Sequence, residues 1–402
     1  MNDLTICPVC HCSVNHILIE QRFAIPTLQN TTLPNSQTAR EFPTGSLRML
    51  RCSECSFVWN ADFDSDRIVY DGNYNNDVST SRYYVEHLEA MAERIVRSIP
   101  SDRPIYYVEV GCGEADFLNL VVRKSGGRCL SAIGFDPSFT GEETLLPGVT
   151  VHKSFFGAEQ LGLVPKNTNV ICSRHTIEHV PDVRGFVSAV AAAMDSPERR
   201  LFFETPDANW ILRNVAFQDF FYEHCSLFTP HSVLRLLSDH GLEGQVDSVY
   251  DGQYMWIEAM RSSQDRPNIE SCELPAKLAD EYRTKQAALI SHWASYVRDR
   301  RERGRVAIWG GASKGVTFAI LLMQQLHCSL ECAIDLNPAK QGRFLPSTAL
   351  PVLAPDEAMR CGVQTVVIMN PNYENEIRAL AQQMDWHPEF ATLNSVVPGN
   401  NE

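Results

Sequence analysis

The segment "FFYEHC" at residues 220–225 places a tyrosine, a glutamate and a histidine side by side, and these side chains can perform proton chemistry. A histidine titrates near neutral pH, so it is a suitable general base. A neighbouring carboxylate can orient the imidazole and stabilise its protonated form. We therefore expect Tyr222, Glu223 and His224 to belong to a reactive centre. The alternative interpretation is a hydrogen-bonded polar cluster in the core.

The composition is that of a globular protein with more than one core. A chain of 402 residues exceeds the size at which one hydrophobic core stops growing, so two or three domains are expected. The formal charge of −14 argues against nucleic acid as a partner, because phosphate binding needs clustered basic side chains. The start of the chain lacks a secretion signal, and no stretch reaches the roughly 18 apolar residues that a membrane span needs. The prediction is a cytoplasmic protein with no membrane partner and with reduced cysteines.

Two pairs of cysteines near the start of the chain have the spacing of zinc ligands. Cys7 and Cys10 form "CPVC", and Cys52 and Cys55 form "CSEC". Each C-x2-C turn brings two sulfurs together, and zinc prefers four thiolates in a tetrahedron. A site with four protein ligands is closed, so the zinc is expected to be structural.

Residues 105–205 alternate short apolar runs with helical stretches, which favours an α/β fold with a parallel sheet. The runs expected to be strands are "IYYVEV", "LSAIGF", "GVTVHK", "NVICS" and "RLFFET". Glu109, Gly111 and Gly113 follow at alternate positions, where glycines let a ligand approach the backbone amides of a helix N-terminus. Asp136 ends the next strand, where a carboxylate can bind ribose hydroxyls. These features predict a nucleoside-binding site.

The E-x-G-x-G spacing resembles motif I of class I S-adenosylmethionine (SAM) methyltransferases, although Ala115 stands where that pattern has a third glycine. The segment "SRHTIEHVPD" is similar to the segment after the fourth strand of that superfamily. The resemblance implies a Rossmann-like SAM-binding domain with Glu109, Gly111, Gly113 and Asp136 at the cofactor. We expect His175 to line the cofactor pocket. His179 begins the next helix, where it is either a structural cap or a substrate contact.

The last third of the chain predicts another fold of the same plan. Residues 273–304 have helical periodicity and end in a basic run before Gly304. "RVAIWGGASKGVTF" then repeats the order of strand, glycine turn and helix, and Asp335 follows the next strand. Ala312 replaces the middle glycine of the dinucleotide pattern, so a scaffold that helps to hold the substrate is favoured over an active NAD site. Ser313 and Lys314 are either phosphate contacts or solvated surface residues.

These modules, in this order, resemble the bacterial sugar C-methyltransferases, which act on nucleotide-linked deoxysugars. The segments "KQGRFLPSTALPVLAPDEA" and "NPNYENEI" of the third module carry the resemblance most specifically. It implies that His224 is the base and that Glu223 orients it. The family has a tyrosine where this chain has Phe221, so Tyr222 lies one residue nearer to the base. Tyr74 matches a further family tyrosine and is expected near the enolate.

The resemblance implies a SAM-dependent C-methyltransferase that deprotonates a carbon next to a ketone of a nucleotide-linked deoxysugar. Methylation of carbon needs a nucleophilic carbon, which an enolate supplies. The alternatives are an O- or N-methyltransferase of another small metabolite and a non-catalytic scaffold. The expected domains are a zinc module at 1–72, a SAM-binding domain at 73–262 and a Rossmann-like domain with its linking helix at 263–402. Monomer and homodimer both remain open.

Overall fold

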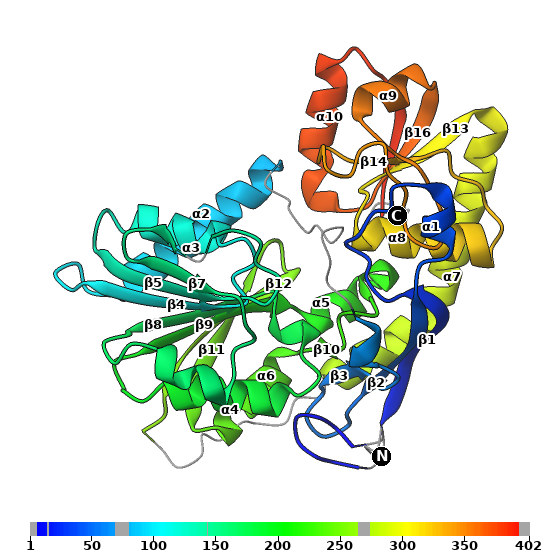
Figure 1. The fold of residues 1–402 in the computed structure, drawn as a ribbon. Coiled ribbons are helices and arrows are strands. Elements are labelled where there is room, and N and C mark those ends of the chain that lie inside the picture. The colour runs from blue at the N-terminus through cyan, green and yellow to red at the C-terminus, as the bar shows by residue number, and fades with distance from the viewer. Residues whose placement is uncertain (1–5, 14–15, 69–79, 143, 264–273, 394–402) are drawn as a thin grey trace.

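The computed structural model describes residues 6–13, 16–68, 80–142, 144–263 and 274–393 (Figure 1). The strands form three sheets, which have four, eight and five strands. The α-helices are α1 (Ser36–Arg40), α2 (Arg82–Ser98), α3 (Asp116–Lys124), α4 (Val183–Ala193), α5 (Ala208–Arg213), α6 (Pro230–Asp239), α7 (Leu274–Arg303), α8 (Ser313–Ala319), α9 (Pro355–Arg360) and α10 (Glu374–Gln383). Shorter turns of helix are η1 (Ser65–Arg67), η2 (Ala158–Leu163), η3 (Ile177–His179), η4 (Phe217–Asp219), the π-helix η5 (Ile320–Gln325) and η6 (Pro371–Tyr373).

The eight-stranded sheet is the central one and confirms the predicted α/β fold. Its strand order is β11-β12-β9-β8-β4-β5-β7-β6. The strands are β4 (Ile105–Val110), β5 (Cys129–Phe135), β6 (Thr144–Leu146), β7 (Val149–His152), β8 (Val170–Arg174), β9 (Arg200–Pro206), β11 (Leu242–Val249) and β12 (Tyr254–Arg261). All five predicted strands are present, and they pair in parallel.

Helices cover both faces of this sheet, with α2 and α3 on one side and α4 and α6 on the other (Figure 1). The central strands are therefore buried on both faces, as the unbroken burial of β8 and the near-continuous burial of β4 show. The chain runs outward from β4 through β5 to β7 and then returns to β8 on the other side of β4. Ligands bind at such a switch point, beside the carboxyl end of the first strand.

The C-terminal sheet is fully parallel and has the order β15-β14-β13-β16-β17. Its strands are β13 (Arg305–Trp309), β14 (Ala333–Ile334), β15 (Val352–Leu353), β16 (Val363–Ile368) and β17 (Glu389–Thr392). The preceding helix α7 ends at Arg303, and the amide of Gly304 closes it on the carbonyl of Arg300. Both the long helix and the second Rossmann-like sheet are therefore as predicted.

The N-terminal sheet is antiparallel and takes one strand from a distant part of the chain. Its order is β1 (Ile17–Pro26), β2 (Thr44–Arg51), β3 (Val58–Asn60) and β10 (Ser226–Leu227). β10 comes after the central parallel strands, yet it pairs with β3. The sheet beside the cysteines therefore includes a segment that begins two residues after His224. The division into domains at 72 and 262 stays a prediction.

Among the helices in the described ranges, none combines the length and apolar character that crossing a bilayer requires.

The approach of Tyr222 to β2 leaves no room for a side chain at Gly45. A Cβ atom at this position would lie 2.2 Å from Cε2 of Tyr222, which is fully buried. Gly45→Ala should therefore lower the free energy of unfolding by about 1–3 kcal/mol through overpacking, measured by chemical denaturation. Gly162→Ala is the matched control, because a Cβ at Gly162 would meet no atom within 4 Å. Equal losses in both variants would contradict this packing.

Candidate active site

The four cysteines predicted to hold zinc lie together. The sulfurs of Cys7, Cys10, Cys52 and Cys55 are all within 4.8 Å of one another. The Cys7 and Cys55 sulfurs are 3.5 Å apart, and so are those of Cys10 and Cys52. Four thiols converging in this way have the donor chemistry and number that a structural zinc ion needs. The assembly of the cluster is therefore confirmed, and it is compatible with zinc.

The glycine loop after β4 has the backbone that its sequence requires. Gly111 and Gly113 have φ angles of 73° and 53°, in the left-handed region that favours glycine. A Cβ at Gly111 would lie 2.0 Å from Oγ1 of Thr176, so the loop packs directly against the segment that carries His175 and His179. A Cβ at Gly113 would meet no atom within 4 Å, which leaves that part of the loop open to a ligand. Ala115 also has a left-handed φ of 65°, where the family pattern has glycine.

The two acidic residues of the predicted cofactor site shape this loop. The amide of Gly113 donates to Oδ2 of Asp136 at 2.8 Å, and the amide of Ser138 donates to Oδ1 of the same carboxylate. Glu109 is buried and accepts from the hydroxyl of Tyr107 at 3.2 Å. Burial raises the pKa of Glu109 to about 8 against the opposing charge of Arg174. An open glycine turn with a carboxylate at the end of the next strand fits the adenosine part of SAM.

A cluster of histidines around a buried carboxylate lies at the carboxyl ends of β8 and β9. Glu178, His179 and His224 have ligand atoms within 4.8 Å of one another. The rings of His179 and His224 meet edge to face, with centroids 4.7 Å apart. Nδ1 of His175 is 3.4 Å from Oε1 of Glu178, and Oε2 of Glu178 accepts from the hydroxyl of Thr205 at 3.0 Å. The structure therefore brings His175, His179 and His224 to one acid.

Burial sets the charge of these groups. It lowers the pKa of His224 to about 3, together with the neighbouring His179 and against the attraction of Glu178. The pKa of His179 is also lowered, mainly by burial. Burial acts to raise the pKa of Glu178, but contact with His175 and the nearby histidine charges lower it to about 2. His224 is thus a neutral imidazole next to an ionised carboxylate.

The neighbours of His224 in sequence point elsewhere. The hydroxyl of Tyr222 accepts from the amide of Asp64 at 2.9 Å, and its ring packs in the core beneath the N-terminal sheet. Oε2 of Glu223 accepts from the amide of Gln29 at 2.7 Å, so this carboxylate holds the loop at residue 29. Burial raises the pKa of Glu223 to about 8. Neither side chain lines the cavity described below, and Tyr74 lies outside the described residues.

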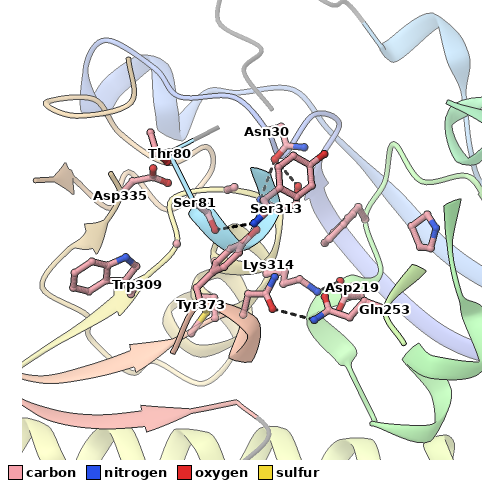
Figure 2. Close-up of a pocket in the computed structure, with 18 of the residues that line it drawn as sticks. Asn30, Thr80, Ser81, Asp219, Gln253, Trp309, Ser313, Lys314, Asp335 and Tyr373 are labelled. Carbon is pink, nitrogen blue, oxygen red and sulfur yellow. Dashed lines mark hydrogen bonds and ion pairs between the residues drawn. The ribbon is translucent and has the colours of Figure 1, made fainter. Parts of the chain in front are cut away.

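A cavity of about 290 Å³ extends from the histidine cluster to the C-terminal sheet (Figure 2). Its lining includes His175, Glu178, His179, Phe221, His224, Tyr254, Ser313, Lys314, Asp335 and Lys340. Phe221 meets the His224 ring edge to face at 4.7 Å, so it forms part of the wall beside this histidine. One continuous space therefore contacts both the histidines and the second glycine turn.

The second glycine turn follows the same design as the first. The amide of Gly311 donates to Oδ2 of Asp335 at 2.9 Å, as Gly113 does to Asp136. Figure 2 shows Lys314 directed at Asp219 and Ser313 beside Asn30, whose side chain accepts from the Ser313 hydroxyl at 2.7 Å. Both residues line the cavity, where Ser313 is buried and Lys314 pairs with Asp219, and contact with a phosphate stays a prediction.

Glu178 is the residue whose place in the cluster the sequence analysis missed. A signal was present, because a glutamate precedes a histidine at Glu178-His179 as well as at Glu223-His224. Which acid meets the histidines depends on tertiary packing, and the acid that does so is Glu178. Lys340 was also missed as a cavity residue. Its side chain is only 3% exposed, and its Nζ is 3.8 Å from Asp335.

The chain matches two known families in succession. Residues 82–246 match the family described as "Methyltransferase domain", and residues 256–393 match the family described as "C-methyltransferase C-terminal domain". The C-methyltransferase NovU of Streptomyces niveus is 25% identical in an alignment of 335 positions that covers 76% of this chain and 76% of that protein. The matches lie on the central and C-terminal sheets, so the glycine loop and the histidines fall within the first match, and the cavity takes its lining from both matches and from residues before them.

Two solved structures resemble parts of the chain. The N,N-8-amino-8-demethyl-D-riboflavin dimethyltransferase RosA of Streptomyces davawensis is 18% identical with a TM-score of 0.36, over 45% of this chain and 56% of that one. An O-methyltransferase family protein from Burkholderia thailandensis is 14% identical with a TM-score of 0.33, over 44% and 57%. The chain thus spans little more than half the length of these two proteins.

Removal of one thiolate from the cysteine cluster should release its metal. Cys52→Ser is expected to reduce the zinc content from about one ion per chain to nearly none, because structural zinc needs all four ligands. The thermal midpoint should fall as well, since the binding energy of a structural metal is also folding energy. Metal analysis and calorimetry measure both effects. The control is Cys361→Ser, an exposed cysteine outside the cluster. Retention of zinc in Cys52→Ser would contradict the assignment.

Proposed function

We propose that this chain, a SAM-dependent C-methyltransferase, methylates a carbon next to a ketone of a nucleotide-linked deoxysugar. The observation that carries this proposal is the single cavity that contacts both the histidine cluster and the second glycine turn. A long acceptor with a reactive ring at one end and a nucleotide at the other suits such a space. The buried Lys340 and the partly buried Lys314 line this cavity and pair with Asp335 and Asp219, and their ammonium groups suit contact with a diphosphate.

We propose that Glu109, Gly111, Gly113 and Asp136 hold SAM, with His175 beside them. When bound, SAM supplies an electrophilic methyl group on a sulfonium. Thr176 packs against Gly111 and lies between His175 and the helical turn of His179. The glycine loop after β4 is therefore in direct contact with the segment that carries these two histidines. This arrangement supports alignment of the acceptor carbon with the donor, which is the main task of an enzyme in a displacement at carbon.

In the proposed mechanism, His224 removes a proton from the carbon next to the ketone, and the electron pair of that C–H bond forms the enolate. Glu178 stabilises the imidazolium that results, in place of the role first assigned to Glu223. His179 lies edge to face against His224 and fixes its ring. SAM held by Glu109, Gly111, Gly113 and Asp136 would supply the methyl group for this enolate carbon, and its sulfur would keep the electron pair of the broken C–S bond. Tyr74 remains a proposed donor to the enolate oxygen.

Two residues of the original assignment are proposed as positioning residues. Glu223 anchors the loop at residue 29, and the next residue, Asn30, accepts a hydrogen bond from Ser313 on the second glycine turn. Tyr222 fixes the backbone of Asp64 against the N-terminal sheet. Both therefore act through the framework of the cavity. Monomer and homodimer remain open, and a cytoplasmic location stays a prediction.

Proton abstraction can be separated from methyl transfer. His224→Asn is expected to lower both methyl transfer and SAM-independent deuterium exchange into the keto-sugar by at least about 100-fold, because general-base catalysis contributes 10² or more. NMR of the substrate in deuterated water measures the exchange, and calorimetry measures SAM binding, which should persist. Exchange at the native rate in the variant would rule out His224 as the base. His387→Asn, at an exposed histidine, is the matched control.

The lowered pKa of His224 also has a consequence for stability. The folded protein keeps this imidazole neutral down to about pH 3, whereas the unfolded chain takes up a proton below about pH 6.5. The free energy of unfolding should therefore fall on acidification below pH 6.5, by up to about 1.4 kcal/mol per pH unit from this group. His224→Asn should remove that part of the slope, measured by denaturation between pH 7 and 5. Parallel curves for the two proteins would contradict the shift.

A further inference from the structure

The histidine cluster has the donor set of a transition-metal site. Glu178, His179 and His224 each offer one ligand atom, and these atoms lie within 4.8 Å of one another. Two imidazoles and one carboxylate are a ligand set that zinc, cobalt and nickel bind, whereas magnesium and calcium prefer oxygen ligands alone. The cluster shares no residue with the four cysteines, so it is a separate site of different chemistry.

An independent observation points to a cation at this position. Glu178 is fully buried, and its Oε2 accepts from the hydroxyl of Thr205. Its Oε1 accepts no hydrogen bond within the described part of the chain and has only the 3.4 Å contact to Nδ1 of His175. A buried carboxylate oxygen without a proper donor is costly. A metal ion bound to that oxygen would remove the cost.

The site is also open to an ion from solution. Its three residues line the cavity, and His179 and His224 are only half-buried. An acceptor ring that enters the cavity must reach the same ring nitrogens. An ion and the acceptor therefore compete for one place.

We propose that Glu178, His179 and His224 bind a divalent transition-metal ion and that this ion inhibits methyl transfer. The inhibition rests on the proposed function of His224 as the base. A ring nitrogen that ligates a metal has committed its lone pair, so it cannot take a proton from carbon. The zinc of the cysteine cluster is untouched, and the protein stays folded while it is inactive.

Binding is tested with Co²⁺ on the full chain that carries zinc in its cysteine cluster. One further Co²⁺ per chain should bind and give visible d–d absorption without a thiolate-to-metal band. Glu178→Gln and His179→Asn should each weaken this binding by at least about tenfold, since even indirect support of a metal site is worth that much. His387→Asn should bind like the native protein. An absence of further Co²⁺, a thiolate band, or unchanged affinity in both cluster variants would overturn the site.

Inhibition is tested in the same preparation with labelled SAM and the acceptor. Co²⁺ or Zn²⁺ at the occupancy found by titration should lower transfer at least tenfold, in competition with the acceptor, and EDTA should restore it. Transfer that is unchanged or faster with the site occupied would overturn the inhibitory role. If His224→Asn keeps full transfer activity, the proposed base fails, and the Co²⁺ titration still decides the metal site.

Discussion

The histidine cluster at the end of the cavity depends on one buried carboxylate. Glu178 lies where the ends of β8 and β9 meet the N-terminal sheet, with histidines and the Thr205 hydroxyl around its carboxylate. Its own backbone carbonyl accepts from the thiol of Cys225 at 3.7 Å. The helical turn η3 is therefore bound through both the side chain and the backbone of Glu178. The ring of His224 packs against His179 of the same turn. If the carboxylate of Glu178 lost its charge, the surrounding histidines and the Thr205 hydroxyl would lose their shared partner.

Two glycine turns of the same local structure lie near this cluster. Each follows the first strand of a parallel sheet, and in each a backbone amide is fixed by the carboxylate that ends the next strand, Asp136 in one and Asp335 in the other. The first turn packs against Thr176 next to the histidines, and the second lines the far end of the cavity. The same local structure thus occurs at both glycine turns, although their surroundings differ.

Much of this arrangement could be predicted from the sequence, because periodicity and spacing are local signals. The parallel strands, the long helix α7 and the four cysteines follow from residue patterns. The role of Glu178 did not follow, since Glu223 precedes a histidine in the same way and only packing distinguishes them. The backbone also bends at Tyr222 and Glu223, which no local pattern predicts, so Tyr222 points into the core while His224 faces the cavity. The pairing of β10 with β3 joins segments too distant for any local pattern to reveal.

That pairing also constrains how the protein is made. β3 leaves the ribosome long before β10, because all the parallel strands of the central sheet are synthesised between them. The N-terminal sheet therefore lacks its edge strand β10 until the central region has been synthesised. Pairing between strands so distant in sequence is slow. A metal ion bound early by the four cysteines would hold the other strands of this sheet in register during translation. His224, two residues before β10, would reach its place only when β10 joins this sheet.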